Sequence, residues 1–500
     1  MLSNLLSAAI LGVKAYPINI EVDVSSGQLP RFSIVGLPDP AVKEARDRVR
    51  SAIKNSGFQI GSKVITVNMA PADIKKEGPS FDFPIALGIL ASLGFVKKER
   101  LSNFIFLGEL ALDGTLRPVP GGLPIASSLA KLGKTLLLPS ESAHEASAES
   151  RVSVIAARSL LEAVQFLNGD IQLETVKIDL RNFLNHRSEF DLDFKDVKGQ
   201  TLAKRALEIA VSGSHHVLMI GVPGSGKSML ARRVPTIWPE LELEEALEII
   251  QIYSVAGLSQ KAKFQRPFRS PHTSISKQGL VGGGNIPKPG EVSLAHHGIL
   301  FLDEFPEFNR DVLESLRAPL EDRVITISRA RQRLTFPANF MLICAMNPCP
   351  CGNLGQKLKP CHCSMRQIER YRGKISGPLM DRIDIHLNVQ PVKYEQLTGK
   401  TPSESSEEIQ RRVQSAREIQ KKRFHNLPYF SNSQIQEKHI RELCPMNLKA
   451  EKILENAITS IGISARSYSR MIKVARTIAD LAESEMIQET HMAEAMQYRS

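Results

Sequence analysis

The chain has 500 residues, of which 42% are apolar and 23% are charged. That length is too great for one hydrophobic core and indicates about three domains of a soluble globular protein. No apolar run reaches the ~20 residues that a membrane helix needs, which excludes a membrane-spanning protein and argues against a membrane partner. The formal net charge of +11 permits an anionic partner such as nucleic acid but does not require one.

Residues 1–165 alternate short β-like runs, such as INIEVDV and KVITVNM, with helical stretches, which predicts an α/β domain. The opening MLSNLLSAAILGVKAYP has no basic residue before its apolar core, and Lys14 ends that core early. We therefore expect a first β-strand rather than a secretory signal. Without an export signal the expected compartment is the cytoplasm, where thiols stay reduced.

Three further regions follow along the chain. Residues 166–192 form an acidic linker, and residues 193–390 have the strand, loop and helix order of a nucleotide-binding core. Residues 391–500 carry apolar residues at helical spacing. We expect this last region to be a helical lid on the core.

The stretch HVLMIGVPGSGKSML joins an apolar strand, a glycine-rich loop and a helix start, and it fits the pattern G-x-x-x-x-G-K-S. Glycines let backbone N–H groups turn toward phosphates, and the helix N-terminus adds a favourable field. Lys227 is expected to neutralise the β- and γ-phosphates of ATP, and Ser228 to offer its hydroxyl to Mg²⁺. The predicted ATP-binding loop consists of Gly221, Val222, Pro223, Gly224, Ser225, Gly226, Lys227 and Ser228.

A second strand, in GILFLDEF, ends in two acidic residues at the edge where open α/β sheets bind ligands. We expect Asp303 to hold Mg²⁺ through water and Glu304 to polarise the attacking water. The next strand, NFMLICAMN, ends at Asn347, whose amide can orient that water or touch the γ-phosphate. This order of elements is that of an AAA+ ATPase core, and it predicts ATP hydrolysis.

Two arginines complete the predicted ATP site, Arg382 as a catalytic residue and Arg466 as a nucleotide-binding residue. Arg382, in GPLMDRIDIHL, stands where rings of this class place an arginine that reaches the γ-phosphate of the neighbouring subunit. Arg466, in SARSYSR, opens a lid helix and is expected to sense the same phosphate, with Arg470 one turn later as the alternative. Surface salt bridges are the competing interpretation of Arg382 and Arg466.

Four of the six cysteines lie in NPCPCGNLGQKLKPCHCS, which starts at Asn347. They form two C-x-C pairs joined by nine residues, a spacing that can bring four thiolates around one tetrahedral Zn²⁺. His362 is an alternative ligand, and four free thiols are the competing interpretation. We expect a structural zinc site made of Cys349, Cys351, Cys361 and Cys363.

The segment RSPHTSISKQGLVGGGNIPKPGEVSLAHHGILFLDEFPEFNRDVLESLRAPLED, followed by ITISRA, FPANF and MNPCPCG, resembles the magnesium-chelatase-like AAA+ proteins. Within them it most resembles the ComM/YifB competence group, nearly end to end. The resemblance implies a homo-hexameric, ATP-driven motor that migrates DNA branches as incoming single strands recombine with the chromosome in natural transformation. It also implies contact with recombinase machinery and a lid of the magnesium-chelatase C-terminal type.

The resemblance further implies two hairpin insertions in the core, at Arg266 to Pro289 and at ITISRARQRLTF. In the second, three arginines alternate and are expected to share one face of a strand. Such a face would grip single-stranded or branched DNA through its phosphates without reading bases. A solvated strand face is the competing interpretation. The predicted DNA contacts are Arg329, Arg331, Arg333 and Lys277.

In the first domain, KKEGPSFDFPIALGILAS and FLGELALDGTLRPVPGGLPIA resemble the proteolytic domain of Lon, an α/β fold of the ribosomal S5 domain 2-like type. Ser80 stands at the nucleophile position, but Pro124 stands where that family has its partner lysine. Lys75 and Lys76, upstream, are the alternative base. Because a serine nucleophile needs a base placed beside it, we expect a non-proteolytic scaffold.

Two functions remain compatible with these residues. The first is the ATP-dependent DNA motor, and the second is a chelatase-type ATPase that remodels a protein partner without touching DNA. Both use the same ATPase core, so only DNA-stimulated ATP turnover separates them. The presence of Lys227, Glu304 and Asn347 disfavours a binding protein with a vestigial ATPase.

Overall fold

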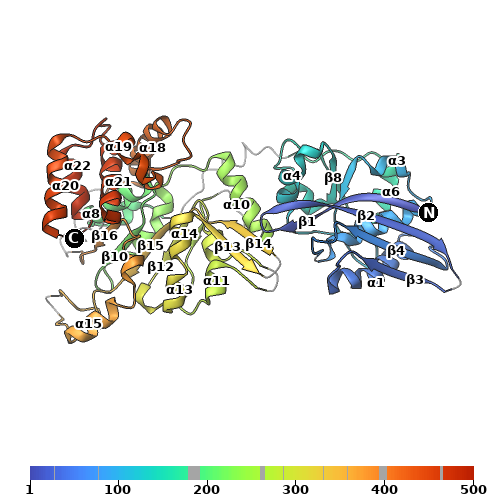
Figure 1. The fold of residues 1–500 in the computed structure, drawn as a ribbon, viewed down its shortest axis with the longest axis horizontal. Helices are drawn as coiled ribbons and strands as arrows, with labels where there is room; N and C mark the ends of the chain where they lie inside the picture. The colour runs from blue at the N-terminus through green and yellow to red at the C-terminus, as the bar shows by residue number, and fades with distance from the viewer. Residues whose placement is uncertain are drawn as a thin grey trace. The chain divides into compact units, whose positions relative to one another are not determined.

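A computed structural model of the chain describes residues 1–27, 29–76, 78–177, 192–258, 265–284, 287–329, 332–356, 359–392, 403–461 and 465–499. Its elements are drawn in chain order in Figure 1. The chain divides into two compact units. Unit 1 comprises Met1–His186, Leu243–Phe264 and Ser328–Phe336, and unit 2 comprises Arg187–Glu242, Gln265–Ile327 and Pro337–Ser500.

A seven-stranded mixed sheet forms the centre of unit 1, with the strand order β3-β4-β2-β1-β5-β8-β9. β2 pairs antiparallel with β1 and β4, and the other neighbours pair in parallel. The first strand begins at Leu2, which confirms the β-strand expected at the start of the chain. The strands are β1 (Leu2–Leu11), β2 (Lys14–Ser26), β3 (Arg31–Val35), β4 (Lys63–Ala70), β5 (Phe104–Phe106), β8 (Thr135–Pro139) and β9 (Val154–Ala157).

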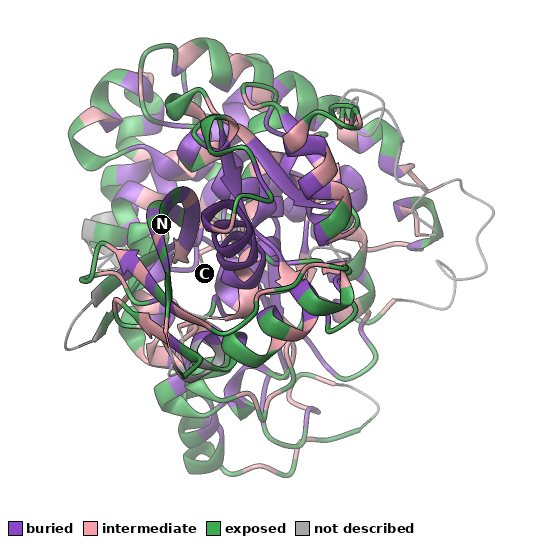
Figure 2. Ribbon diagram, turned by 90° about the vertical axis from the view of Figure 1, so that its right-hand side faces the viewer, coloured by how far each residue is buried: buried purple, intermediate pink, exposed green. Residues whose placement is uncertain are grey.

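Alternation along these strands gives unit 1 two apolar faces. Phe104 and Phe106 of β5 pack in one cluster, while Ile105 between them packs in the other. The first cluster is covered by α1 (Pro40–Asn55), α2 (Asp82–Ser92) and α6 (Leu160–Asn168), and the second by α4 (Gly122–Leu129) and α5 (Ser140–Ala146). Every residue of α2 is buried, and Figure 2 draws such residues in purple.

Helix α10 (Leu243–Val255) belongs to unit 1, although the residues before it belong to unit 2. Ile250 of α10 packs with Leu123 and Ala148 in a small apolar cluster. The hydroxyl of Ser254 accepts a hydrogen bond from the backbone N–H of Gly121 at 2.7 Å. Unit 1 is therefore not one continuous stretch of the chain, because α10 comes from a later part of the sequence.

A five-stranded, all-parallel sheet forms the centre of unit 2, with the order β11-β12-β15-β10-β16. Alternation again separates two faces: Val217 and Met219 of β10 enter one cluster, and Leu218 enters the other. Buried on both faces, these strands are nearly continuous apolar runs, as parallel strands usually are. They are β10 (Val217–Ile220), β11 (Phe268–Arg269), β12 (Ile299–Leu302), β15 (Met341–Met346) and β16 (Ile385–Asn388).

Helices cover both faces of this sheet, which confirms the α/β class predicted for the core. The first face carries α8 (Thr201–Gly213), α9 (Lys227–Arg233) and the C-terminal helices α18 (Ser406–Arg423), α19 (Ile440–Leu443), α20 (Leu448–Ile461), α21 (Ala465–Leu481) and α22 (Glu489–Gln497). The second face carries α11 (Lys277–Val281), α12 (Glu291–Leu294), α13 (Arg310–Glu314), α14 (Arg317–Asp322), α15 (Met365–Arg372) and α16 (Gly377–Met380). Among the helices that the structure describes, none is long and apolar enough to cross a membrane.

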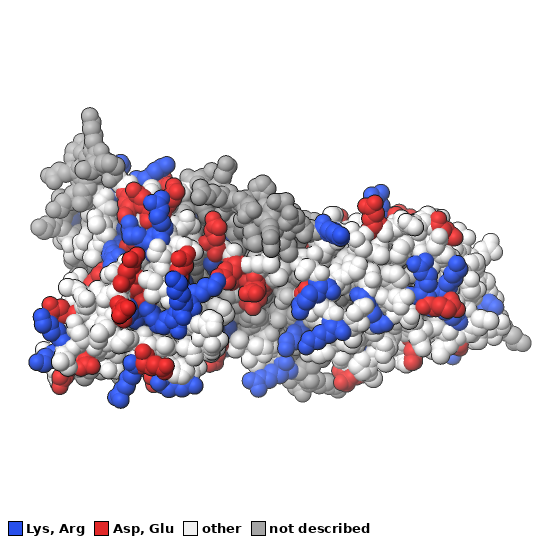
Figure 3. All heavy atoms as spheres, turned by 90° about the horizontal axis from the view of Figure 1, so that it is seen from above, with Lys and Arg blue, Asp and Glu red and all other residues white. Residues whose placement is uncertain are grey.

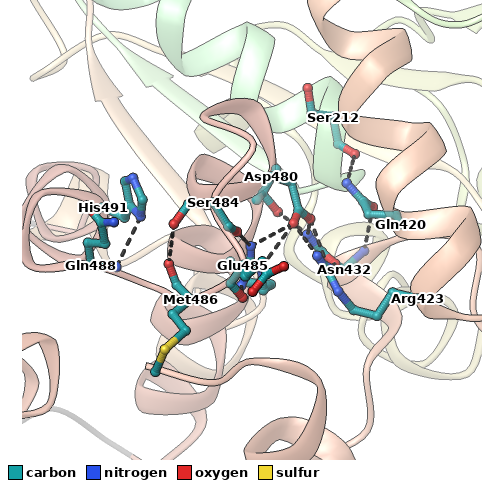
Figure 4. A network of polar contacts seen from close by, with 12 residues as sticks. Ser212, Gln420, Arg423, Asn432, Asp480, Ser484, Glu485, Met486, Gln488 and His491 are labelled. Carbon is teal, nitrogen blue, oxygen red and sulfur yellow. Dashed lines mark hydrogen bonds and ion pairs between the residues drawn. The ribbon is translucent and has the colours of Figure 1, made fainter. Parts of the chain in front are cut away.

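A buried polar network joins the C-terminal helices to one another (Figure 4). The carboxylate of Asp480 on α21 accepts hydrogen bonds from Arg423 at 2.9 Å, from Asn432 at 2.7 Å and from Arg476 at 3.0 Å. Asp480 and Arg476 are both fully enclosed. Because each buried charge has a charged partner and further hydrogen bonds, the network fixes how these helices pack.

Candidate ATP site and four-cysteine cluster

The phosphate loop lies between β10 and α9, at the carboxyl edge of the parallel sheet. Gly224 and Gly226 adopt left-handed φ angles of 77° and 94°, which a residue with a side chain rarely adopts. Gly226 stands directly before the first residue of α9, so the loop ends on a helix N-terminus as the sequence predicts.

The side chain of Lys227 is buried inside this loop. Its ammonium donates to the carbonyls of Gly221 at 2.7 Å and Val222 at 3.1 Å, and to the amide oxygen of Asn347 at 3.3 Å. Burial lowers the pKa of Lys227, and the nearby carboxylate of Asp303 works in the opposite direction. The Lys227 ammonium therefore lies inside the loop, against its backbone carbonyls.

Asp303 and Glu304 follow β12 directly. The Ser228 hydroxyl donates to the Asp303 carboxylate at 2.7 Å, which brings together the two predicted Mg²⁺ ligands. Glu304 is exposed, and its φ of 52° is unusual for a residue other than glycine. Such backbone strain clusters at functional sites, which agrees with the role predicted for this carboxylate.

Asn347 follows β15, the central neighbour of both β10 and β12. Ile220 pairs with Met346 in the sheet, and the N–H of Gly221 donates to the Met346 carbonyl at 3.2 Å. Three parallel strands therefore end side by side, and they bring together Lys227, Asp303 and Asn347, which are far apart in the sequence. This is the arrangement expected where ligands bind open α/β sheets.

Arg382 precedes β16 and is buried within the chain. Its guanidinium forms an ion pair with Glu321 of α14 at 2.6 Å and donates to the carbonyl of Pro378 at 2.7 Å. Arg470 of α21 donates to the Arg382 carbonyl at 2.7 Å and to the Asp384 carboxylate at 2.6 Å. Arg466, one turn earlier on α21, is exposed.

Asp384 links these arginines to the start of β10. Its carboxylate accepts from the backbone N–H of His216 at 2.9 Å. Burial would raise the pKa of Asp384, but Arg470 and the neighbouring histidines hold it well below its usual value. The His216 ring nitrogen Nδ1 accepts from the N–H of Leu342 at 3.1 Å, and burial lowers the pKa of His216 to about 4.

Glu321 and Asp384, the carboxylate partners of the arginines, were not predicted from the sequence. Asp384 stands two residues after Arg382 in DRIDIHL, which is a signal that could have identified it. Glu321 lies on α14, and no feature of the sequence around it indicates that it pairs with Arg382.

The four cysteines of the predicted zinc site lie together in unit 2. Sulfur–sulfur distances are 3.4 Å for Cys349–Cys351 and 3.6 Å for both Cys349–Cys361 and Cys351–Cys361. All four sulfur atoms, including that of Cys363, lie within 4.8 Å of one another. A tetrahedron with Zn–S bonds of about 2.3 Å has sulfur atoms about 3.8 Å apart, so the cluster fits a four-thiolate metal site.

The protein environment favours thiolate at one of these four cysteines. Backbone hydrogen bonds from Asn353 and His362 lower the pKa of Cys351 to about 6. Although backbone hydrogen bonds lower the pKa of Cys361 and Cys363, burial and hydrogen bonds to neighbouring thiols raise it above its usual value. Thiolate is the form that binds metal. His362 is exposed and does not belong to the group of side chains that the described structure gathers as ligands.

The predicted DNA contacts do not lie on one strand. β13 (Val324–Arg329) ends at Arg329, β14 (Gln332–Pro337) begins at Gln332, and the two strands pair with each other in a two-stranded sheet. The expectation of a single strand face is therefore wrong, because the period-two pattern runs from the end of one strand into the start of its partner. Arg333 is exposed, and Arg331 lies outside the described residues.

In this hairpin Gln332 and Arg333 open β14, and Leu334 follows with a buried side chain. Arg333 and Leu334 therefore point in opposite directions, as successive strand residues do. Lys277, the fourth predicted contact, is exposed at the first position of α11.

The other predicted insertion, Arg266 to Pro289, contains β11, α11 and an antiparallel bridge between Gly283 and Lys288. Arg266 donates to the carbonyls of Pro239 at 2.8 Å and His297 at 3.0 Å, and Arg269 forms a bidentate pair with Glu291. These two arginines stabilise the fold from within the chain.

In unit 1, Ser80 lies in a short 3₁₀ turn, Pro79–Phe81, and Pro124 lies in α4. The ammonium of Lys76 is buried and donates to the Pro71 carbonyl, and burial lowers its pKa. Lys76, one of the two alternative bases for Ser80, is therefore engaged with a backbone carbonyl.

Three family models match the chain. "Subunit ChlI of Mg-chelatase" matches residues 20–142, "Magnesium chelatase, subunit ChlI" matches residues 193–397, and "Magnesium chelatase, subunit ChlI C-terminal" matches residues 403–499. The last two cover the parallel core and the C-terminal helices.

Relatives that match over nearly their full length point to the same family. The chain is 44% identical to competence protein ComM of Haemophilus influenzae, over 99% of this chain and 96% of that protein. It is 43% identical to YifB of Escherichia coli, over 100% of this chain and 97% of that protein. A shorter stretch, 27% of this chain and 26% of the other protein, is 30% identical to Lon protease 2 of Bacillus subtilis.

The Lon similarity lies in the N-terminal region and agrees with the α/β fold found there. The chain therefore belongs to the ComM/YifB group of the magnesium-chelatase-like AAA+ family, with a Lon-like α/β domain before its AAA+ core and helical lid.

Proposed function

We propose that this chain is the subunit of a homo-hexameric, ATP-driven DNA motor that promotes branch migration as incoming single-stranded DNA recombines during natural transformation. The name of the Haemophilus influenzae relative, a competence protein, supports the biological setting. The convergence of Lys227, Asp303 and Asn347 at the ends of three parallel strands is the observation that carries the ATPase part of the proposal, and the name of that relative supports the DNA part.

ATP would bind with its phosphates in the loop Gly221–Gly226. Lys227 would exchange its carbonyl partners for the β- and γ-phosphates, since a phosphate is a stronger partner for an ammonium than a carbonyl is. Ser228 and Asp303 would hold Mg²⁺, which neutralises phosphate charge when bound. Glu304, exposed beside Asp303, would polarise the attacking water, and the Asn347 amide would orient it.

Arg382 would act on the ATP of the neighbouring subunit. Within one chain it is paired with Glu321, so acting in the ring requires it to exchange that carboxylate for the γ-phosphate. Arg466 is the exposed candidate for sensing phosphate from the lid, and Arg470 is the alternative that is already tied to Asp384.

The four cysteines would hold one structural Zn²⁺. Four protein ligands fill a tetrahedral site and leave no position for a water, so the metal would not take part in hydrolysis. The metal would instead stabilise the loop that begins at Asn347.

DNA would contact the β13–β14 hairpin, which carries Arg329, Arg331 and Arg333, and the α11 region at Lys277. Figure 3 shows basic and acidic side chains interspersed on the left part of the drawn face, and a local group of mostly basic side chains nearer its middle. Several arginines of α18 are likewise paired, Arg412 with Glu208 and Arg411 with Glu407 at 3.8 Å. Because many basic side chains are paired with acidic ones, we expect DNA to contact short basic segments such as the β13–β14 hairpin, and not a broad positively charged surface.

The decisive experiment uses purified protein on synthetic three-strand and four-way junctions, with and without ATP. Strand exchange that requires ATP, and ATP turnover that DNA stimulates, are the expected results. Lys227→Ala and Glu304→Gln should abolish both, because the first removes the phosphate partner and the second removes the water-polarising carboxylate. Turnover that remains in either variant would reject the assigned site.

The alternative function is a chelatase-type ATPase that remodels a protein partner. The match of the core and lid to magnesium-chelatase subunit models favours it as the second candidate. ATP turnover unaffected by any DNA structure, with no junction processing, would select this alternative.

A further inference from the structure

We propose that the four-cysteine loop braces the phosphate loop, so that zinc at the cysteines sets the affinity for ATP, with Gly352 as the positioning residue between them. The inference rests on the proposed ATP and zinc sites. It adds a coupling between them.

Gly352 follows Cys351 directly and lies against the phosphate loop. A Cβ atom built on Gly352 would come within 2.7 Å of both Cδ and Cγ of Pro223, and 4.0 Å from Cγ of Asn347. Contacts below 3.0 Å are not tolerated, so only glycine allows the cysteine loop to approach the proline ring this closely. Pro223 lies inside the phosphate loop, four residues before Lys227.

The Gly352 backbone is also tied to the cysteines. Its N–H donates to the carbonyl of Cys349 at 3.0 Å, which closes a turn around the first C-x-C pair. Its φ of 80° belongs to the left-handed region. A metal that fixes Cys349 and Cys351 therefore fixes the position of Gly352 as well.

The other end of the same segment touches the ATP site through Asn347. The Asn347 amide oxygen accepts from Lys227 at 3.3 Å. Arg372 of α15 donates to the carbonyl of Pro348 at 3.3 Å, and α15 starts just after the last cysteine pair. The segment from Asn347 to Gly352 is thus held at the cysteines and at α15, and it contacts the phosphate loop at two points.

Bound metal would keep this segment ordered. Without metal, the thiols offer only weak hydrogen bonds, and ordering the loop costs conformational entropy. The braced arrangement would then be populated for a fraction of the time, and the apparent affinity for ATP would fall by that fraction. The expected loss is about tenfold when the braced state falls to roughly a tenth of the population.

The test compares two glycines of the same loop. Gly352 and Gly355 have left-handed φ angles of 80° and 85°, but a Cβ on Gly355 meets nothing within 4 Å. Gly352→Ala and Gly355→Ala therefore carry similar backbone strain, and they differ in the contact with Pro223. Three quantities are measured in each variant: zinc content, melting temperature and the dissociation constant of a fluorescent, non-hydrolysable ATP analogue.

Gly352→Ala should bind the analogue about tenfold more weakly than Gly355→Ala while keeping its zinc. Chelating the zinc from the wild-type protein should weaken binding by a similar factor, and it should add little in Gly352→Ala. Pro223→Ala removes the proline ring that Gly352 lies against and leaves the cysteine loop unaltered. Its affinity for the analogue should likewise change little when zinc is chelated.

Equal analogue affinities in the two alanine variants, or full affinity after zinc removal, would overturn the brace. A wild-type protein purified without zinc would overturn it as well. Failure of the wild-type protein to process DNA junctions would reject the motor function, but the brace would stand as long as analogue binding still depended on zinc and Gly352.

Discussion

Replacing Asp480 by alanine is expected to destabilise the C-terminal helices strongly. Asp480 is buried and is the shared acceptor of Arg423 and Asn432, which Figure 4 labels, and of Arg476. Arg476 is also fully buried. Removing the carboxylate leaves a buried guanidinium without its counter-charge, which typically costs about 3–5 kcal/mol.

The matched control is an exposed ion pair in the same group of helices. Glu489 of α22 pairs with Lys449 at 3.6 Å, and their side chains are 48% and 71% exposed. Exposed pairs of this kind contribute about 0–1 kcal/mol, so Glu489→Ala should change stability little.

The assay is thermal unfolding, together with hydrogen exchange of the backbone amides in α18 and α21. With about 2–4 °C of melting-temperature shift per kcal/mol for a unit of this size, Asp480→Ala should lower the transition by roughly 10 °C. Exchange should accelerate in both helices because they share the network. A shift in Asp480→Ala no larger than that of Glu489→Ala would refute the reasoning.

Three further predictions concern protonation, DNA and metal. Because burial holds the pKa of His216 at about 4, the unfolded chain binds more protons above that pH, and stability should fall by about 2 kcal/mol from pH 7 to pH 5. His216→Asn keeps an acceptor for Leu342, so urea unfolding should lose that pH dependence; an unchanged dependence would contradict the assignment. Alanine at Arg329, Arg331 and Arg333 should reduce the slope of log affinity for single-stranded DNA against log salt by about 2, and binding with an unchanged slope would dismiss the hairpin contact. Cys361→Ser with Cys363→Ser should abolish the binding of about one zinc per chain, measured by elemental analysis; retained zinc would reject the four-cysteine site.

The local sequence pattern was sufficient to predict the strand, glycine-rich loop and helix of the candidate phosphate site. Its glycines, Lys227 and Ser228 are contiguous, and the flanking strand and helix have their own apolar periodicity. The first strand was likewise predictable, because its apolar core has no basic residue before it and ends early at Lys14. In both cases the physical cause acts over a few neighbouring residues.

The β13–β14 hairpin shows where a local pattern misleads. The arginines alternate with a period of two, and this spacing continues unchanged from the end of β13 into the start of β14. No glycine, asparagine or proline stands between Arg329 and Gln332, so the sequence lacks the usual signal for a reversal.

The sequence by itself was enough to predict the candidate sites of this protein: a loop for phosphates, acids at a strand end and four thiols at a metal-binding spacing. The tertiary structure decided which residues meet. Arg382 with Glu321, Asp480 with Arg423, and Gly352 with Pro223 join positions that lie far apart in the chain. Such pairings arise from the packing of whole helices and loops, which depends on the summed burial of many side chains and leaves no mark in the residues nearby.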